Sequence, residues 1–420
     1  MGGELKEAIE DLHQRKNDTI YRIGKPINED KINVISEDAV KFGKDNTTRL
    51  SNKLCEQFEF LKVKELETKL EELPPGEPRR EAYLACKSDP FSKTLFTAPS
   101  TCEVHSTSSE FREEATSFLS LHSPLMRQYG LQIIPLTGRN DITTDDFGHN
   151  LKATTGVRGG DRTTLHNDIH RVIGNSIFEA GIPMKGKLPE TCANTFSHLI
   201  NTQGNNTRER EEERDRMKQG IIPDIIVLAN PAFPGTDPVN TIYDGKNTIC
   251  DIKTLGPGLA YKNRTATSNS PTESRQSQVN TEYYKSAKDI DRKFNGTSQS
   301  QQGPVQEELL KYGNQGKVAG LVVGNYGEGS THLRQLATFV AKHEALKQSH
   351  YSNASEEERA KVRARCEKRI INLWGLTFHR GWARLLINRT SLLIRNETFD
   401  PQEDEGEEEE GEEQGIDGAI

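Results

Sequence analysis

Three short apolar runs in the second half of the chain constrain its fold more than any other feature. They cover residues 221–228, 248–255 and 317–324 and are rich in Ile, Val and Leu. Their length and β-branched content favour strands that are buried on both faces. Because segments with helical patterning separate them, the order of elements predicts a mixed α/β (α+β) domain.

Helical patterning is clearest just before the first of these runs. In the segment 163–180 apolar residues recur on one stripe, and Gly181 follows where the helix should end. Further helices are expected at 278–294, 305–312 and 332–348. Ser355 and Glu358 form a capping box for another helix, which is expected to reach about Leu373.

The rest of the chain divides by composition. Apolar residues at near-helical spacing predict a long amphipathic helix from Leu50 to just before Pro74. We expect four parts: a mainly helical accessory region, the α/β domain, a C-terminal helical extension and a disordered acidic tail. Their expected bounds are 1–150, 151–350, 351–398 and 399–420.

The acidic tail changes how the net charge is interpreted. The formal charge of the chain is −8, but residues 400–420 carry eleven carboxylates and no Lys or Arg. Without those eleven negative charges the remaining residues have a net charge of +3. The charge of the body therefore neither excludes nor requires a polyanionic partner.

Several classes of protein are excluded by the same composition. No run approaches the roughly 18–20 apolar residues of a membrane span, and the first residues lack the apolar core of a signal peptide. The six cysteines lack the close pairs of a closed zinc site. We expect an intracellular protein of the nucleus or cytoplasm, neither secreted nor membrane-bound.

Two acidic motifs lie on the first two apolar runs. Asp224 lies in the first run, directly before Ile225, and Asp251 and Lys253 lie in the second. Asp251 and Lys253 point to the same side because side chains alternate along a strand. If the strands pair, Asp224 and Asp251 converge on one divalent cation, and oxygen ligands favour Mg²⁺ or Mn²⁺. Such a cation would activate water against a phosphodiester, with Lys253 positioning that water or neutralising developing charge.

This pattern resembles the PD-(D/E)XK nuclease superfamily, which has the restriction-endonuclease-like fold. Pro223-Asp224 takes the place of its first acidic motif, and Asp251-Ile252-Lys253 takes the place of its second. The resemblance implies a central mixed sheet flanked by helices. It also implies catalysis by the two aspartates and the lysine, with both aspartates as metal ligands.

The helix before the strands often contributes to the site in this superfamily. Some members place a histidine metal ligand there, and His166 takes that position here. Asp168 and His170 are expected to support the site, as is Gln278 near the start of the following helix. For Asp168 the alternative is an acid in the first turns that interacts with the helix dipole.

A second resemblance covers residues 82–345 approximately. It is to the region that follows the reverse transcriptase in certain retrotransposon polyproteins. The shared features are an Asp-Asp-Phe-Gly-His segment at 145–149, a Gly/Arg loop at 158–162 and a helix that begins at His166. The cysteines usual in that region near 145–149 are absent, and the chain has no Tyr-x-Asp-Asp polymerase motif. The resemblance implies a nuclease derived from a mobile element, without polymerase activity.

Basic residues in the helix at 278–294 could contact nucleic acid. Four of them recur over two turns of the helix: Lys285, Lys288, Arg292 and Lys293. They are expected to bind phosphates, and the alternative is that they form a solvated face of the helix. Core packing is favoured over base stacking for Tyr283 and Tyr284. The glycine-rich segment 324–330 is interpreted as a tight turn, because its spacing misses the known phosphate-binding fingerprints.

The sequence thus predicts a metal-dependent endonuclease that hydrolyses phosphodiester bonds in DNA. Its expected cofactor is Mg²⁺ or Mn²⁺, and its expected partner is nucleic acid. Two alternatives stay open. One is a catalytically inactive nucleic-acid-binding protein that keeps the nuclease fold, and the other is an RNA endonuclease, which His166 beside the aspartates suggests.

Overall fold

A computed structural model of the chain describes residues 47–97, 105–130, 133–134, 142–154, 161–192, 195–200, 221–228, 247–258, 261, 270–313, 316–348, 351 and 353–394. The chain divides into two units, Met1–Pro74 and Pro75–Ile420. The expected boundaries at residues 150 and 350 both lie inside the second unit. The expected tail at 399–420 lies outside the described residues.

The described part of the first unit is one long helix, α3 (Thr47–Glu72). It agrees with the helix expected to begin near Leu50 and to end before Pro74. Ion pairs one turn apart, Lys64 with Glu67 and Lys69 with Glu65, join exposed positions along it. Several large apolar side chains of this helix are exposed, among them Phe58, Phe60 and Leu66.

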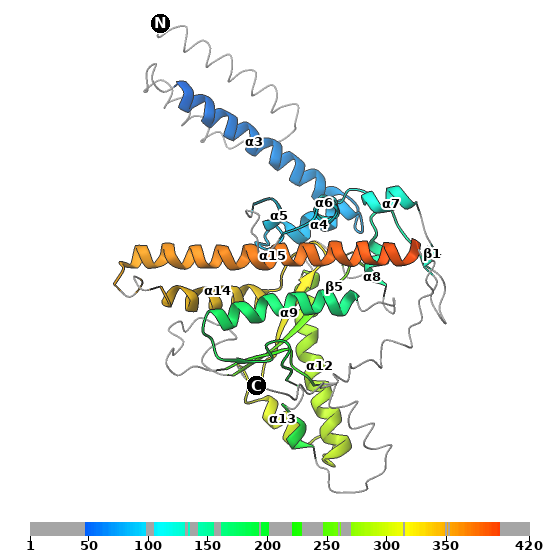
Figure 1. The fold of residues 1–420 in the computed structure, drawn as a ribbon, viewed down its shortest axis with the longest axis vertical. Helices are drawn as coiled ribbons and strands as arrows, with labels where there is room; N and C mark the ends of the chain where they lie inside the picture. The colour runs from blue at the N-terminus through cyan, green and yellow to red at the C-terminus, as the bar shows by residue number, and fades with distance from the viewer. Residues whose placement is uncertain are drawn as a thin grey trace, which may run out of the picture. The chain divides into compact units, whose positions relative to one another are not determined.

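The second unit is built on a four-stranded mixed sheet, in which Figure 1 labels β5. The strand order is β3-β4-β5-β6. Its strands are β3 (Met184–Lys185), β4 (Ile225–Val227), β5 (Thr248–Leu255) and β6 (Ala319–Gly324). The first three strands pair antiparallel, and β6 pairs parallel with β5. The three apolar runs thus form adjacent strands, and the mixed α+β class is confirmed.

One face of the sheet packs against α9 (Asp161–Glu179), α14 (Thr331–Leu346) and α15 (Glu356–Ile394). Side chains that alternate along the strands, such as Cys250 and Ile252, point into this core. Trp374 of α15 is fully buried there and donates its indole N–H to Ser176 at 2.9 Å. The helix α15 continues well past Leu373, because its buried side chains extend to Leu393.

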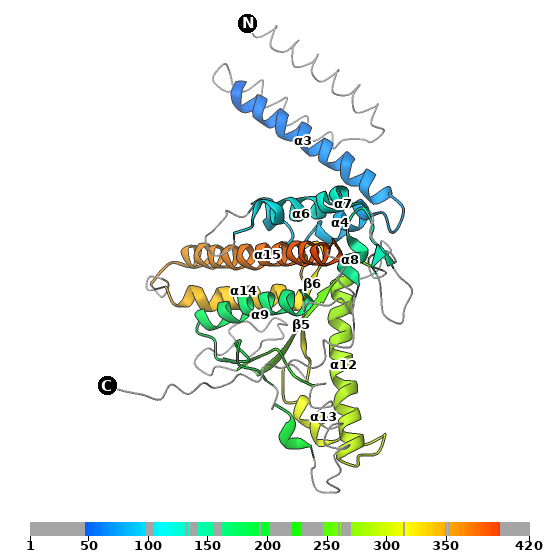
Figure 2. The same cartoon turned by 45° about the vertical axis from the view of Figure 1, so that its right-hand side comes forward.

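The other face packs against α12 (Pro271–Phe294), which runs down one side of the sheet in Figure 2, and against α13 (Pro304–Leu309), which lies beside the lower part of α12. Val279 and Tyr283 of α12 join Ile226 and Ile249 of the strands in this second core. The helix α12 begins earlier than expected because the Ser270 side chain caps it, accepting a hydrogen bond from the Glu273 N–H at 3.3 Å.

Shorter elements complete the second unit around α15. They are α4 (Pro78–Cys86), α5 (Thr94–Thr97), α6 (Ser108–Phe118), α7 (Pro124–Tyr129), the hairpin β1 (Ile133–Ile134) and β2 (Ile142–Thr143), α8 (His149–Ala153) and the 3₁₀ turn η2 (Ser197–Leu199). The helices α5, α6, α7 and α8 contact α15, which also contacts α9 and α14. Segments from both sides of residue 150 therefore share one unit. Within the described part of the chain, no helix is both long and apolar enough to cross a membrane.

Candidate functional site

The two acidic motifs meet where β4 and β5 pair. The antiparallel register places Ile225 opposite Cys250, so Asp224, one residue earlier, lies beside Asp251. The Asp224 Oδ2 atom accepts a hydrogen bond from the backbone N–H of Ile252 at 2.6 Å. This bond fixes the carboxylate against the neighbouring strand, and the structure brings Asp224 and Asp251 together as the sequence predicts.

Asp251 is almost fully buried, with 3% of its surface exposed. Its Oδ2 atom lies 2.8 Å from Lys253 Nζ, and its Oδ1 atom accepts a hydrogen bond from the Tyr283 hydroxyl at 3.1 Å. The Lys253 side chain is 36% exposed, so its ammonium group can reach both the buried carboxylate and solvent. An ion pair and a hydrogen bond thereby offset part of the cost of burying this charge.

Tyr283 makes a contact with the acid pair that the sequence did not predict. Its ring lies in the core against the sheet, as expected, but its hydroxyl reaches the proposed catalytic carboxylate. Burial raises the pKa of Tyr283 well above its usual range, and the charges of Asp251 and Asp224 raise it further. The hydroxyl therefore keeps its proton and remains a hydrogen-bond donor to Asp251.

The two carboxyl groups have pKa values shifted in opposite directions. Burial raises the pKa of Asp251 despite the attraction of Lys253, and the charge of Asp224 raises it further. Burial also acts to raise the pKa of Asp224, but the hydrogen bond and charge of His166 outweigh it, so this pKa is lowered. Asp224 is thus the more readily ionised of the pair.

Two histidines one turn apart on α9 face Asp224. His166 Nε2 lies 3.3 Å from Asp224 Oδ2, and the pKa of His166 is raised because this carboxylate outweighs the effect of burial. His170 Nε2 donates to the Gly186 carbonyl at 2.7 Å, and burial lowers the pKa of His170. One ligand atom from each of His166, His170 and Asp224 lies within 4.8 Å of the other two.

These groups fit a divalent cation. Two imidazoles and a carboxylate at this spacing form a common transition-metal donor set. Asp251 Oδ2 forms an ion pair with the ammonium of Lys253 and accepts no other hydrogen bond from the described residues. His170 would have to use Nδ1 as a ligand while its Nε2–H stays bonded to Gly186, which is how metal-binding histidines are commonly oriented.

Gly186 allows the close approach that holds Asp224 in place. Its φ is +81°, and a Cβ atom there would lie 2.2 Å from the backbone oxygen of Asp224 and 2.8 Å from Cys192 Sγ. Only glycine accommodates both the left-handed backbone and this contact. The segment after β3 therefore packs directly against the strand end that carries the first acid.

The other residues predicted for the site lie elsewhere. Asp168 is 2.9 Å from Arg171 and 3.7 Å from Arg384 of α15. Gln278 is exposed on α12, where Arg275 donates to it at 3.2 Å. The structure does not bring either residue to the two aspartates.

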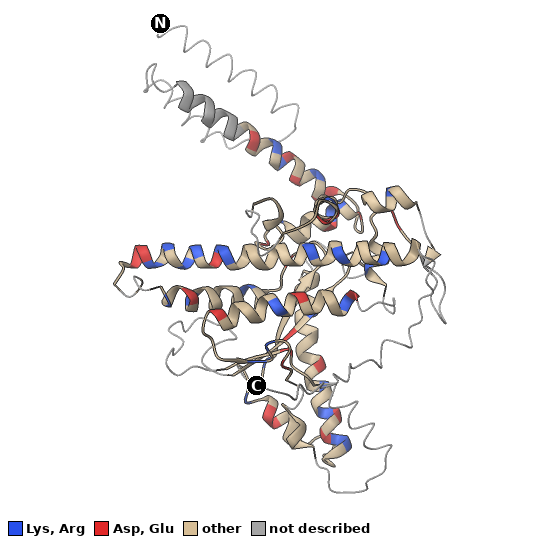
Figure 3. Cartoon of the chain, viewed as in Figure 1, with Lys and Arg blue, Asp and Glu red and all other residues tan. Residues whose placement is uncertain are grey.

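The four basic residues of α12 are exposed, and three of them lie on the side of the helix opposite Tyr283. At about 100° per residue, the positions of Lys285, Lys288 and Arg292 point away from the buried stripe. Acidic residues alternate with them (Figure 3), and Arg292 pairs with Asp289 at 3.3 Å. The structure thus separates them from the aspartate pair, and their predicted phosphate contacts would have to be made on another face.

The glycine-rich segment 324–330 forms a tight turn, as expected. Its backbone N–H groups are used within the protein: Asn325 donates to Tyr261, Tyr326 to Glu328, Gly327 to Gly324, and Gly329 to Asp89. These amides are therefore already bonded and cannot form a phosphate cradle.

Comparisons with models of known protein families, with curated proteins and with solved structures found no match to this chain.

Proposed function

We propose that the second unit is a divalent-metal-dependent endonuclease that hydrolyses phosphodiester bonds, with DNA as the favoured substrate. The observation that carries this proposal is the convergence of Asp224, Asp251 and Lys253 from two paired strands, beside His166 of α9. The order of elements supports a restriction-endonuclease-like core. The helix α9 precedes antiparallel β4 and β5, and α12 connects β5 to parallel β6.

Each residue of the cluster has a distinct proposed role. Asp224, Asp251 and His166 would hold the cation, which when bound polarises a phosphodiester oxygen and activates water. Lys253 extends from the buried carboxylate toward solvent, where it neutralises charge that develops on the phosphate. Tyr283 fixes the orientation of Asp251, and His170 positions the backbone behind Asp224 through its bond to Gly186.

The donor set favours Mn²⁺ over Mg²⁺. Mg²⁺ prefers oxygen ligands, and imidazole nitrogen is a poor ligand for it. Mn²⁺ also binds carboxylate oxygen, but as a transition metal it accepts imidazole nitrogen more readily than Mg²⁺ does. Because His166 would supply an imidazole nitrogen beside Asp224, we expect activity with Mn²⁺ to exceed activity with Mg²⁺. The His166→Ala variant should lose that preference.

Cleavage of plasmid and oligonucleotide DNA in the presence of Mn²⁺ tests the proposal. The Asp251→Asn variant should lose at least about 100-fold in rate, because it removes a charged ligand from the metal site. Glu179→Gln, an exposed acid near the end of α9, is the matched control and should cut normally. Cleavage that survives Asp251→Asn would show that the assigned site is wrong.

The same assay separates the two alternatives. The histidine beside Asp224 favours RNA as a second candidate substrate, so matched RNA and DNA strands should be compared. Binding without cleavage, unaffected by metal and weakened by salt, would indicate an inactive nucleic-acid-binding protein.

A further inference from the structure

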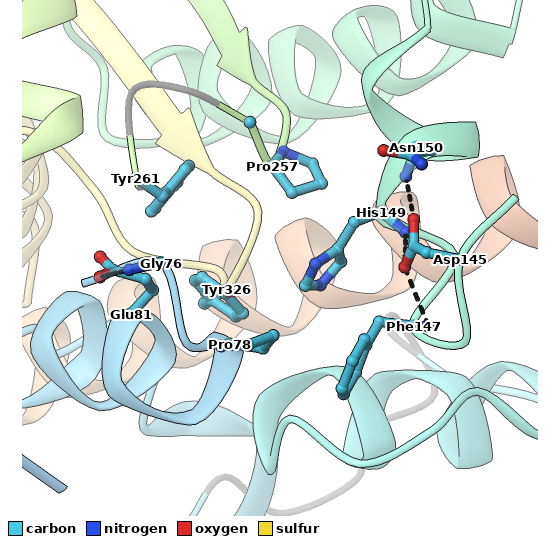
Figure 4. A pocket seen from close by; sticks show the side chains of 11 residues that line it. Gly76, Pro78, Glu81, Asp145, Phe147, His149, Asn150, Pro257, Tyr261 and Tyr326 are labelled. Atoms are coloured by element: carbon cyan, nitrogen blue, oxygen red, sulfur yellow. Dashed lines mark hydrogen bonds between the residues drawn. The ribbon is translucent and has the colours of Figure 1, made fainter. Parts of the chain in front are cut away.

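A pocket of about 200 Å³ lies in the second unit beyond the C-terminal end of β5 (Figure 4). It is several times larger than the roughly 30 Å³ that one water occupies in the liquid. It is also smaller than the roughly 300–1,000 Å³ of sites for drug-sized ligands. The pocket therefore suits a single small head group. It does not overlap the proposed nuclease site, because none of Asp224, Asp251 and Lys253 lines it.

Aromatic rings from three separate segments form its walls. Phe147 and His149 stack with ring centroids 5.4 Å apart, and His149 meets the edge of Tyr326 at 6.3 Å. Tyr261 stands at 89° to Tyr326, with centroids 5.5 Å apart. Rings at nearly right angles surround a volume from several sides, whereas a slot for a flat nucleobase needs parallel faces.

The charged side chains that line the pocket are both acidic, Glu81 and Asp145. Arg80 pairs with Glu81 at 3.0 Å and offsets its charge, so Asp145 contributes most of the negative charge of the lining. That charge repels a phosphate or carboxylate and attracts a cation. Aromatic faces attract a cation as well, through the negative face of each ring. Walls and charge therefore favour the same class of ligand.

The hydrogen-bonding capacity of the lining is largely used within the protein. Asp145 accepts hydrogen bonds from the backbone N–H groups of Phe147, His149 and Asn150. Glu81 Oε1 accepts from the Gly76 N–H at 3.2 Å and from the neighbouring Arg80 side chain at 3.0 Å. Glu81 Oε2 accepts no hydrogen bond from the described residues but is itself buried, so few accessible acceptor positions remain for a ligand.

The Tyr261 hydroxyl adds little to that capacity. Tyr261 donates to Glu328 and accepts from the Asn325 N–H, so this residue offers mainly its ring. A primary ammonium with three N–H donors would lose its hydration here without replacement. A methylated ammonium has no such requirement.

The walls are held rigidly before any ligand binds. Arg162 and Arg389 donate to backbone carbonyls at the end of α8, the helix that carries His149. Tyr326 belongs to the hydrogen-bonded turn after β6, and its ring is 2% exposed. A preformed cage costs little ordering free energy on binding.

We propose that this aromatic cage binds a methylated ammonium group. The group could belong to a small molecule such as choline or to a trimethyllysine side chain of a protein partner, and the chemistry recognised is the same. The proposal is independent of the nuclease assignment, because binding at the cage involves neither the aspartates nor a metal.

Calorimetric titration of the full-length protein tests this proposal. The probes are tetramethylammonium, choline, a peptide that contains one lysine, and the same peptide trimethylated at that lysine. The trimethylated peptide should bind at least about tenfold more tightly than the unmodified one. Phe147→Ala and His149→Ala, both at half-buried positions, should weaken binding roughly two- to thirtyfold. Phe111→Ala, an exposed ring on α6, is the control and should bind normally.

The remaining comparisons distinguish the two possible sources of the methylated ammonium group and test the alternatives to the proposal. A trimethylated peptide that binds more tightly than choline indicates a protein side chain, and equal affinities indicate a small molecule. Asp251→Asn should bind these probes as the wild type does, whatever the outcome of the cleavage assay. Equal affinity for the two peptides, binding of nucleosides in their place, or no saturable binding of any probe would overturn the proposal.

Discussion

At the scale of single residues, the buried environment of Glu328 changes its acid–base chemistry. It is 2% exposed, in the turn after β6, and accepts hydrogen bonds from the Tyr326 N–H at 3.0 Å and from the Tyr261 hydroxyl. Burial raises the pKa of Glu328 from 4.5 to about 7 despite these bonds. The folded protein therefore binds this proton under conditions in which the unfolded chain releases it.

Glu328→Gln is expected to change how stability depends on pH. The proton on Glu328 contributes its full stabilisation below pH 4.5, and this contribution is lost as the pH rises to about 7. Over that range the wild type should lose up to about 3 kcal/mol more of its free energy of unfolding than the variant. Urea denaturation at several pH values measures this difference. Identical pH profiles would show that the carboxyl group is ionised in the folded state.

Residue patterns predicted the acidic residues of the candidate site better than the residues that hold those acids in place. Alternation along a strand placed Asp251 and Lys253 on one side of β5, and strand pairing brought Asp224 beside them. Tyr283 belongs to an apolar stripe at helical spacing, so the sequence does not distinguish it from any core tyrosine. Its bond to Asp251 depends on how α12 crosses the sheet, which local patterns do not encode.

At the scale of elements, the two-residue strand β3 supports the site more than its length suggests. It pairs with β4 and leads into Gly186, whose carbonyl accepts from His170 and whose Cα lies against Asp224. Long apolar runs are predictable because burial on both faces restricts their composition. A strand of two residues is too short to show an apolar run or an alternating pattern, so the sequence could not predict this contact.

Gly186→Ala is expected to impair both folding and cleavage. The left-handed backbone costs an alanine about 1–3 kcal/mol, and the added Cβ must also displace the backbone of Asp224. Thermal unfolding measures the first effect, and the DNA cleavage rate with Mn²⁺ measures the second.

Gly296→Ala separates backbone strain from displacement of the acid. Gly296 also has a positive φ, +67°, but a Cβ there would meet no atom within 4 Å. Its alanine variant should lose stability from strain alone and keep its cleavage rate. Equal activity in the two alanine variants would show that the position of Asp224 does not depend on Gly186.

At the scale of the whole molecule, the packing of α15 determines how the second unit is organised. This helix contacts α5 and α6 from before residue 150 as well as α9 and α14 from after it. The expected boundaries at residues 150 and 350 rested on changes of composition along the chain. Composition does not record which helices pack together, so the sequence could not show that these segments share one unit.

The acidic residues at 400–420 are expected to weaken the binding of nucleic acid to the rest of the chain. Deleting residues 400–420 removes eleven carboxylates and changes the net charge from −8 to +3. If the tail competes with nucleic acid for the body of the protein, the deletion should tighten DNA binding. The effect should be largest at low salt, because the screening length is about 30 Å at 0.01 M but about 8 Å at 0.15 M.

Fluorescence anisotropy with labelled DNA, without divalent metal so that no cleavage occurs, measures this affinity across a salt series. A chain in which residues 400–420 are replaced by an uncharged Gly/Ser segment of equal length is the control for length alone. It should behave like the deletion, because charge, and not bulk, is the expected cause. Equal affinities of the intact and truncated chains at low salt would rule out competition by the tail. A gain that persists unchanged at high salt would require a cause other than its charge.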